Sequence, residues 1–511
     1  MARKIVQLHS PGNQRENASA DSCDGSSGAP SSKRENQADA LVRLALKSAI
    51  YFHHGEEAYA QINAGDHLET ILLRSSAFRI WLAGIFYKKQ QKPANREAIG
   101  NSIETLAARA IYDGQEHDIF TRVAQHDGKI YIDLGDPSWC AVEVSQLTWR
   151  VISSRECPVR FRRAKGTAAL PMPAEGGSIA DMRAFLNLGS DDDFFLITAW
   201  LVAAARPTGP YPILIVHGEK GACKSSMVRI LRDLIDPSDA PLRSAPREER
   251  DLAIAAKNGW VITGENLSHL SAELSDSLCR LSTGAGLTTR KLYTDDEETI
   301  FLASRPIVLN AISEIATRPD LLDRAIVISL PAMQDGNRKA EDDLRREFAQ
   351  ARPQLFGALL DAVVVALGNI DTVKVDNMPR MADFSKWITA AESALPWATG
   401  DFLRAYRANR MSANELAVEA SSVAEAVRAL ARPWSGTATE LLAALNSQLG
   451  DKRPPKNWPD APRALTNRLR NIAPDMRAMG IDVQLPDGRN HDRTIYIDDV
   501  SQQGRSARAG A

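Results

Sequence analysis

Cysteine is scarce in this chain. Its 511 residues include five cysteines, and no two of them form a C-x-x-C pair. This scarcity excludes a disulfide framework and a zinc site built from paired thiolates. We expect all five to be free thiols in a reducing compartment: Cys23, Cys140, Cys157, Cys223 and Cys279.

Long apolar runs are also missing. The longest, Phe194–Ala205, has 12 residues and includes Thr198, so it is too short to span a bilayer and fits a buried helix. Residues 1–10 contain no apolar run of the signal-peptide type. We therefore expect a cytoplasmic protein with no membrane partner.

Neither sign of charge predominates. The chain has 62 Lys plus Arg and 64 Asp plus Glu, which gives a net charge of −2. Its 44% hydrophobic and 25% charged residues are close to the averages of soluble globular proteins, which excludes a collagen-like or wholly disordered chain. Any surface that binds nucleic acid must therefore be local.

Apolar patterning divides the chain into segments. Residues 9–38 contain almost no large apolar side chains and cannot offset the entropy lost on ordering. The remainder predicts a multidomain α/β fold. In chain order we expect a disordered tail (1–38), an N-terminal α+β module (39–170), an α/β domain (171–345), a helical region (346–432), a small C-terminal domain (433–500) and a flexible tail (501–511).

The N-terminal module combines helical and strand-like patterns. His126-Asp127-Gly128 is a hairpin turn signal between two of the strands. One predicted helix includes Leu41 and Ile50, and two more helices are predicted at 77–88 and 98–111. The predicted strands are 120–124, 129–134 and 142–151.

The α/β domain contains continuous apolar runs between helical segments. Such runs are typical of a parallel sheet that is covered on both faces. The predicted strands are 211–217, 259–263, 306–310 and 325–330.

A glycine-rich loop, GEKGACKSS, follows the first of these runs and precedes a helical pattern. This context predicts a phosphate-binding loop for ATP, with Lys224 at the β and γ phosphates and the Ser225 hydroxyl on Mg²⁺. The alternative is a glycine-rich surface turn before an ordinary helix. The candidate cofactor-binding residues are Gly218, Glu219, Lys220, Gly221, Ala222, Cys223, Lys224, Ser225 and Ser226.

The loop departs from the pattern G-x-x-x-x-G-K-[ST] at one position, because Cys223 stands where that pattern has glycine. A side chain at this position restricts the backbone and crowds the loop. The departure leaves the strength of nucleotide binding open.

Polar residues end the next two strands. Glu265 is a candidate to hold Mg²⁺ or orient the attacking water, and Asn310 is a candidate contact for the γ-phosphate or water. Arg324 is a candidate arginine finger that would act across a subunit interface. The alternatives are solvated strand ends and a surface ion pair.

Residues 209–331 resemble the AAA+-type ATPases of superfamily 3 helicases and of related phage and mobile-element replication proteins. The resemblance is carried by GEKGACKSS, NGWVITGENL, RPIVLNAI and RPDLLDRAIVISLP. It implies a P-loop ATPase domain, ATP and Mg²⁺ as cofactors, and a ring of subunits, expected to be a hexamer, around single-stranded DNA. Glu265 stands where these phage proteins usually have Asp. The same resemblance implies that Arg290 and Lys291 contact the DNA backbone.

The C-terminal segment is similar to a winged helix. Arg463, Asn467 and Arg470 share one face of a predicted helix, and Arg489 and Arg493 lie on or near the turn between two strands. We expect these residues to bind duplex DNA. The alternative is a protein-binding winged helix with a solvated basic face.

Together these features predict a DNA-dependent ATPase of helicase type that acts in phage or mobile-element DNA replication. Cys223 and Glu265 motivate an alternative, a nucleotide-gated DNA-binding scaffold with weak or no hydrolysis. A further alternative is an initiator that assembles on duplex DNA without unwinding it.

Overall fold

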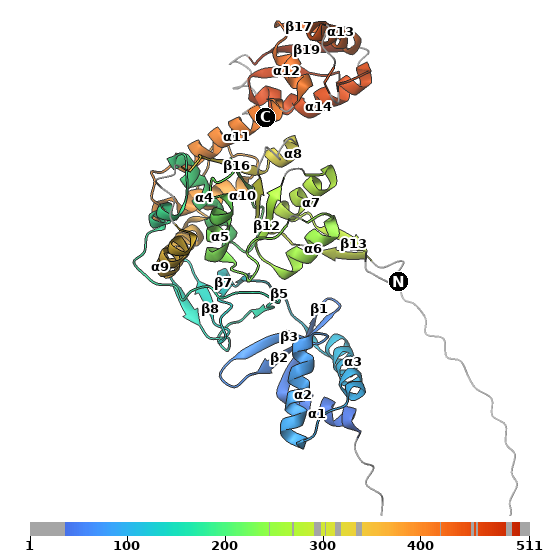
Figure 1. The fold of residues 1–511 in the computed structure, drawn as a ribbon, viewed down its shortest axis with the longest axis vertical. Coiled ribbons are helices and arrows are strands. Elements are labelled where there is room, and N and C mark those ends of the chain that lie inside the picture. Colours follow the sequence, from blue (N-terminus) through green and yellow to red (C-terminus); the bar gives the residue numbers. More distant parts are fainter. Residues whose placement is uncertain are drawn as a thin grey trace, which may run out of the picture.

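The computed structural model describes residues 36–500 and confirms a multidomain α/β fold with a parallel sheet. Figure 1 shows the N-terminal helices and strands at one end, the parallel sheet in the middle and a helix/strand domain at the other end. The description omits 245, 268–269, 291–297, 302, 312–317, 334–339, 420, 451–453, 456–457 and 487–492.

The N-terminal unit packs helices against a mixed sheet of strand order β3-β2-β1-β4. Ile50, which we predicted in a helix, lies in β1, because α1 ends at Ser48 and the next residues alternate in burial along a strand. The elements are α1 (Gln37–Ser48), β1 (Ala49–His54), β2 (Glu57–Asn63), β3 (Leu68–Leu72), α2 (Ser76–Gln90), α3 (Arg96–Tyr112) and β4 (Gln115–Glu116).

A second unit, residues 119–178, contains a four-stranded antiparallel meander and a short parallel pair of strands. It shares a core with the central domain, because Ile132 and Val142 pack in one cluster with Trp200. The predicted single strand 142–151 is wrong, because Ser145 bonds Thr148 and turns the chain. The elements are β5 (Ile119–Phe120), β6 (Val123–His126), β7 (Lys129–Asp133), β8 (Ala141–Val144), β9 (Trp149–Ile152) and β10 (Arg160–Phe161).

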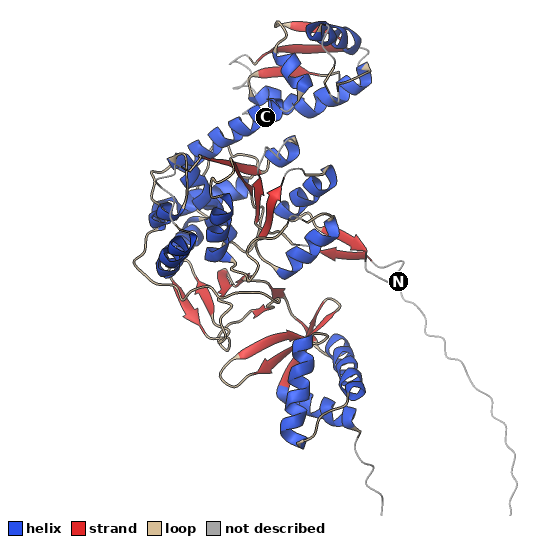
Figure 2. Ribbon diagram, in the orientation of Figure 1, coloured by secondary structure: helices blue, strands red, loops and turns tan. Residues whose placement is uncertain are grey.

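The central sheet has the strand order β12-β15-β11-β16, and every pairing in it is parallel. Leu214 and Val216 face one core and Ile213 and Ile215 face another, so the sheet is covered on both sides, as Figure 2 shows. The elements are η1 (Ile179–Phe185), α4 (Asp191–Ala204), β11 (Ile213–Gly218), α5 (Lys224–Ile235), α6 (Glu249–Asn258), β12 (Ile262–Leu267), α7 (Ala272–Thr283), β13 (Leu287–Arg290), β14 (Glu298–Phe301), β15 (Ile307–Ala311), α8 (Pro319–Leu322) and β16 (Ala325–Leu330).

Long helices follow the sheet: α9 (Glu341–Asn369), α10 (Ala382–Ala391) with η3 (Glu392–Ala394), and α11 (Asp401–Glu419). By length and composition alone, α9 is apolar enough to cross a membrane, but 56% of its apolar window is buried within the protein. Because α9 packs against α10, α4 and α5, we interpret it as a core helix.

The C-terminal domain is a three-stranded antiparallel sheet of order β17-β19-β18 packed against helices. Thr437 and Glu440 exchange hydrogen bonds in a capping box at the start of α13. Strand β17 lies outside the predicted strands. The elements are α12 (Ser422–Arg428), β17 (Trp434–Thr437), α13 (Ala438–Leu449), α14 (Pro462–Ala478), β18 (Ile481–Gln484) and β19 (Thr494–Asp499).

Candidate functional site

The loop between β11 and α5 has an unusual backbone. Gly218, Gly221 and Cys223 have φ values of 153°, 89° and 64°. A Cβ at position 218 would lie 2.8 Å from the carbonyl oxygen of Leu330, so glycine is required there. Cys223 adopts the left-handed conformation, with ψ 26°, which costs an L-residue about 1 kcal/mol. This conformation is the physical reason why a glycine suits this position.

Lys224 lies inside the loop. Its Nζ donates hydrogen bonds to the carbonyl oxygens of Gly218 at 2.7 Å and Glu219 at 2.9 Å. The residue is 8% exposed, and desolvation lowers the pKa of its ammonium group. The loop therefore surrounds a positive charge with backbone groups.

Ser225, Glu265 and Asn310 form one hydrogen-bonded chain. The Ser225 hydroxyl donates to Glu265 Oε1 at 2.6 Å, and Asn310 Nδ2 donates to Ser225 Oγ at 3.1 Å. Asn310 is 1% exposed, and its Oδ1 atom has no hydrogen-bond partner within the described part of the chain. The structure therefore brings together three of the residues that the sequence singled out.

Strand order explains this meeting. Asn310 is the register partner of Val216, which lies two residues before Gly218, and Leu309 is the partner of Gly264. Because β15 lies between β11 and β12, the carboxyl ends of all three strands reach the same edge of the sheet. In open α/β sheets, ligands bind beyond the carboxyl ends of the strands.

The end of β12 is irregular beside Glu265. The register shifts between Gly264 and Leu267, and Asn266 has a φ of 54°. The backbone N–H of Glu265 donates to the carbonyl oxygen of Arg243 at 3.0 Å. This bulge and the neighbouring segment fix the direction of the Glu265 side chain.

Arg324 lies far from the phosphate loop, at the opposite edge of the central sheet. It immediately precedes β16, whose last residue, Leu330, is the register partner of Gly218. At about 3.3 Å per strand residue, Arg324 is roughly 20 Å from the loop of its own subunit, at the opposite edge of the sheet. Its Nη1 donates to the carbonyl oxygen of Asp320 at 2.8 Å.

The candidate DNA-contacting residues are only partly described. Arg290 lies in β13 without a described side chain, and Lys291 and Arg489 lie outside the described residues. On α14, the exposed residues Arg463, Asn467 and Arg470 lie opposite the buried face, and Arg470 Nη1 donates to Asn467 Oδ1 at 3.3 Å. Arg493 is exposed immediately before β19. The basic face that we predicted on this helix is therefore present and exposed.

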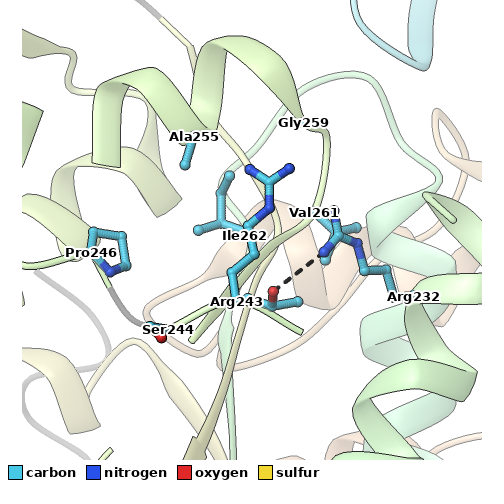
Figure 3. Close-up of a pocket in the computed structure, with 9 residues that line it drawn as sticks. Arg232, Arg243, Ser244, Pro246, Ala255, Gly259, Val261 and Ile262 are labelled. Carbon is cyan, nitrogen blue, oxygen red and sulfur yellow. Dashed lines mark hydrogen bonds between the residues drawn. The ribbon is translucent and has the colours of Figure 1, made fainter. Parts of the chain in front are cut away.

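A small cavity of about 30 Å³ lies beside β12 (Figure 3). Arg232, Arg243 and Thr263 are among the residues that line it, and Arg232 Nη1 donates to Thr263 Oγ1 at 3.4 Å. A space of this volume holds about one water molecule. It is too small for a nucleotide.

One further residue at the loop carries no signal in the sequence. Asn187, between η1 and α4, donates from Nδ2 to the carbonyl oxygens of Ala222 at 3.3 Å and Pro331 at 2.8 Å. It belongs to no motif, and only the folded chain brings it to Ala222.

No group of three or more His, Cys, Asp or Glu side chains capable of holding a metal ion occurs among the residues that the structure describes. A cation at the loop would therefore depend on the oxygens of Ser225, Glu265 and Asn310. These oxygens are the hard ligands that Mg²⁺ prefers, and the unpartnered Asn310 Oδ1 is one of them. The donor set fits a Mg²⁺ ion that also takes phosphate oxygens and water.

Two protein-family models match the chain. The model of the actinomycete integrative conjugative element replication protein matches residues 179–416, and the model of the RepA C-terminal domain of these elements matches residues 423–508. The two matches together cover more than half of the chain, in consecutive order. No curated protein matches it.

Solved structures also resemble the fold at low similarity. An apo structure of the NrS-1 C-terminal region is 13% identical, with a TM-score of 0.39, over 90% of this chain and 99% of that one. Another apo structure of the same region is 14% identical, with a TM-score of 0.38, over 92% and 100%. At such scores the likeness carries no argument about function.

Proposed function

We propose that this chain is a replication protein of a mobile element, like the actinomycete integrative conjugative element replication proteins whose models match residues 179–416 and 423–508, and that it works as an ATP-binding, DNA-dependent ATPase of helicase type. The observation that carries this proposal is the hydrogen-bonded chain of Ser225, Glu265 and Asn310 beside Lys224. These residues come from neighbouring strand ends, as a nucleotide site in a parallel sheet requires.

Each residue has a distinct role in this proposal. The loop N–H groups and the Lys224 ammonium bind the phosphates of ATP, and the N-terminus of α5 adds a favourable dipole. Ser225 and Glu265, together with Asn310 Oδ1, would hold Mg²⁺, which neutralises charge on the phosphates when bound. Glu265 and Asn310 orient the attacking water through their oxygen and amide groups.

Arg324 supports a ring of subunits. It is too far from its own phosphate loop to touch a nucleotide there, because the whole length of β16 separates the two. An arginine supplied by a neighbouring subunit stabilises charge in the transition state of phosphoryl transfer. We propose that each subunit provides this arginine to the next one.

DNA binding is assigned to two places in this proposal. The order of helices and strands in the C-terminal domain is that of a winged helix, with the exposed Arg463, Asn467 and Arg470 on the helix that would enter a groove of duplex DNA. Single-stranded DNA would lie in the ring channel, against the β13–β14 hairpin that carries Arg290.

The test is ATP hydrolysis by the purified full chain with and without single-stranded DNA. Turnover that DNA stimulates is expected for the wild type, and Lys224→Ala is expected to lose it by at least about 100-fold, because the phosphates lose their buried cation. Lys88→Ala, an exposed lysine at the end of α2, is the matched control and should retain full turnover.

A second function is favoured by the strained Cys223. If ATP binds but is not hydrolysed with or without DNA, the chain is a nucleotide-gated DNA-binding scaffold or an initiator. Removal of the whole C-terminal domain from Ser421 onward separates these two outcomes, because an initiator loses sequence-dependent duplex binding. Absence of ATP binding in the wild type would overturn both functions.

A further inference from the structure

Asn187 reaches the phosphate loop from outside it. Its side-chain amide donates to the carbonyl oxygen of Ala222 at 3.3 Å and to that of Pro331, just beyond β16, at 2.8 Å. Both hydrogen atoms of the amide are therefore directed at backbone carbonyls. Asn187 ties the loop to the end of a strand that is distant in sequence.

The bonded carbonyl belongs to the peptide that joins Ala222 to Cys223. A peptide unit is planar, so holding its oxygen fixes both the ψ angle of Ala222 and the φ angle of Cys223. That φ angle is 64°, which an L-residue adopts at a cost. In a trans peptide the N–H of Cys223 points away from Asn187, on the side opposite the bonded oxygen.

The neighbourhood leaves this peptide little freedom. Ala222 is 1% exposed, and a Cβ built at Gly218 would lie 3.3 Å from the Ala222 Cβ. A Cβ built at Gly189, two residues after Asn187, would lie 3.9 Å from Pro331 Cδ and 3.9 Å from the carbonyl oxygen of Ser329. The segment that carries Asn187 therefore packs on the same strand end as the loop.

We propose that Asn187 is a positioning residue, which holds Cys223 in the left-handed conformation and thereby keeps the phosphate loop in its binding geometry. The proposal rests on the proposed ATP binding for its functional consequence. It explains how this chain accommodates a cysteine where glycine adopts the same conformation without strain. Asn187 acts through the loop and does not itself contact the phosphates.

The experiment is a double-mutant cycle with Asn187→Asp and Cys223→Gly, read by the dissociation constant of ATP in the full chain. Aspartate has the same shape but cannot donate, so Asn187→Asp should weaken binding about tenfold when Cys223 is present. In the Cys223→Gly background, the loss should shrink to less than about threefold, because glycine needs no support at positive φ.

A second readout requires no nucleotide. Amide hydrogen exchange in residues 219–224 should be faster in Asn187→Asp than in the wild type, whereas Asn101→Ala, an exposed asparagine on α3, should leave it unchanged. If the wild type binds no ATP, the proposed function fails and this exchange experiment alone decides the role of Asn187.

Two results would overturn the proposal. One is an equal loss of affinity from Asn187→Asp in the wild-type and Cys223→Gly backgrounds, which would make Asn187 a general packing residue. The other is unchanged amide exchange in the loop of Asn187→Asp.

Discussion

At the scale of single residues, the phosphate loop is governed by one backbone angle. The sequence shows that Cys223 stands where the loop pattern has glycine, and the structure shows that this position, at the N-terminus of α5, requires the left-handed conformation. Cys223 Sγ lies 3.9 Å from the carbonyl oxygen of Gly221 and makes no side-chain cap to the helix. The cysteine therefore introduces strain without a compensating cap.

Replacing this cysteine by glycine should strengthen nucleotide binding. Cys223→Gly removes about 1 kcal/mol of backbone strain, so the dissociation constant of ATP should fall about fivefold, as measured by calorimetric titration. Cys223→Ala is the matched control, since it keeps the Cβ and the strain but removes the thiol. An equal gain in both variants would show that the thiol, and not the backbone, limits binding.

At the scale of elements, the position of β16 separates the arginine from the loop. Arg324 precedes β16 and Gly218 ends β11, and these two strands run parallel. The length of one strand therefore separates the arginine from the loop of its own subunit. In the proposed ring, hydrolysis requires the arginine of one subunit at the loop of another.

Mixing two inactive variants should therefore restore hydrolysis. Lys224→Ala lacks a functional loop and Arg324→Ala lacks the arginine, but a mixed assembly contains some sites with both groups intact. At equal concentrations the mixture should regain about a quarter of wild-type turnover, if each subunit pairing is random and each site works independently.

The matched control for this mixture is Arg346→Ala, an exposed arginine on α9, which should hydrolyse ATP normally by itself. Arg324→Ala should still bind ATP. A mixture of Lys224→Ala and Arg324→Ala as inactive as either variant would contradict action between subunits.

At the scale of the whole molecule, the C-terminal domain packs against α8, the short helix that precedes Arg324. Helix α14 packs against α8 and α11. Burial raises the pKa of the Asp475 carboxyl on α14 to about 6, with the Asp320 carboxylate acting in the same direction and Arg410 opposing the shift. Helix α14 thus carries a carboxyl group, Asp475, whose charged form is destabilised by burial and by the nearby Asp320.

The docking of the C-terminal domain should therefore depend on pH. We expect docking to raise the pKa of the Asp475 carboxyl, so the docked state is most stable relative to the undocked state below about pH 4. This extra stability is lost as the pH rises through about 6, because the buried carboxyl must then become charged. Its size is about 1 kcal/mol, since Asp475 keeps contact with solvent. Limited proteolysis between α11 and α12 should accelerate from pH 4 to pH 7 by about fivefold.

Asp475→Asn tests the same interpretation at fixed pH. The neutral amide removes the unfavourable charge, so the variant should be cleaved slowly at pH 7 and show little pH dependence. Asp460→Asn, in the same domain but before α14, is the control and should keep the wild-type profile. A retained pH dependence in Asp475→Asn would assign the effect to another group.

The sequence by itself determined what depends on neighbouring residues. Apolar runs marked three of the four parallel strands closely, whereas the predicted strand 259–263 covers only the first two residues of β12. The Asp127-Gly128 turn, with φ values of 47° and 74°, closed the predicted hairpin, and Thr437 began its helix. The loop motif likewise identified Lys224 and Ser225. These features are local because turn, cap and strand preferences act over a few residues.

Only the tertiary structure decided which distant residues meet. Strand β15 enters between β11 and β12, and this order brings Asn310 to Ser225 across 85 residues of sequence and Glu265 across 40. It also brings Asn187 to the loop carbonyl. The physical reason is that strand order follows from how two cores are buried on the faces of one sheet, which no local pattern specifies.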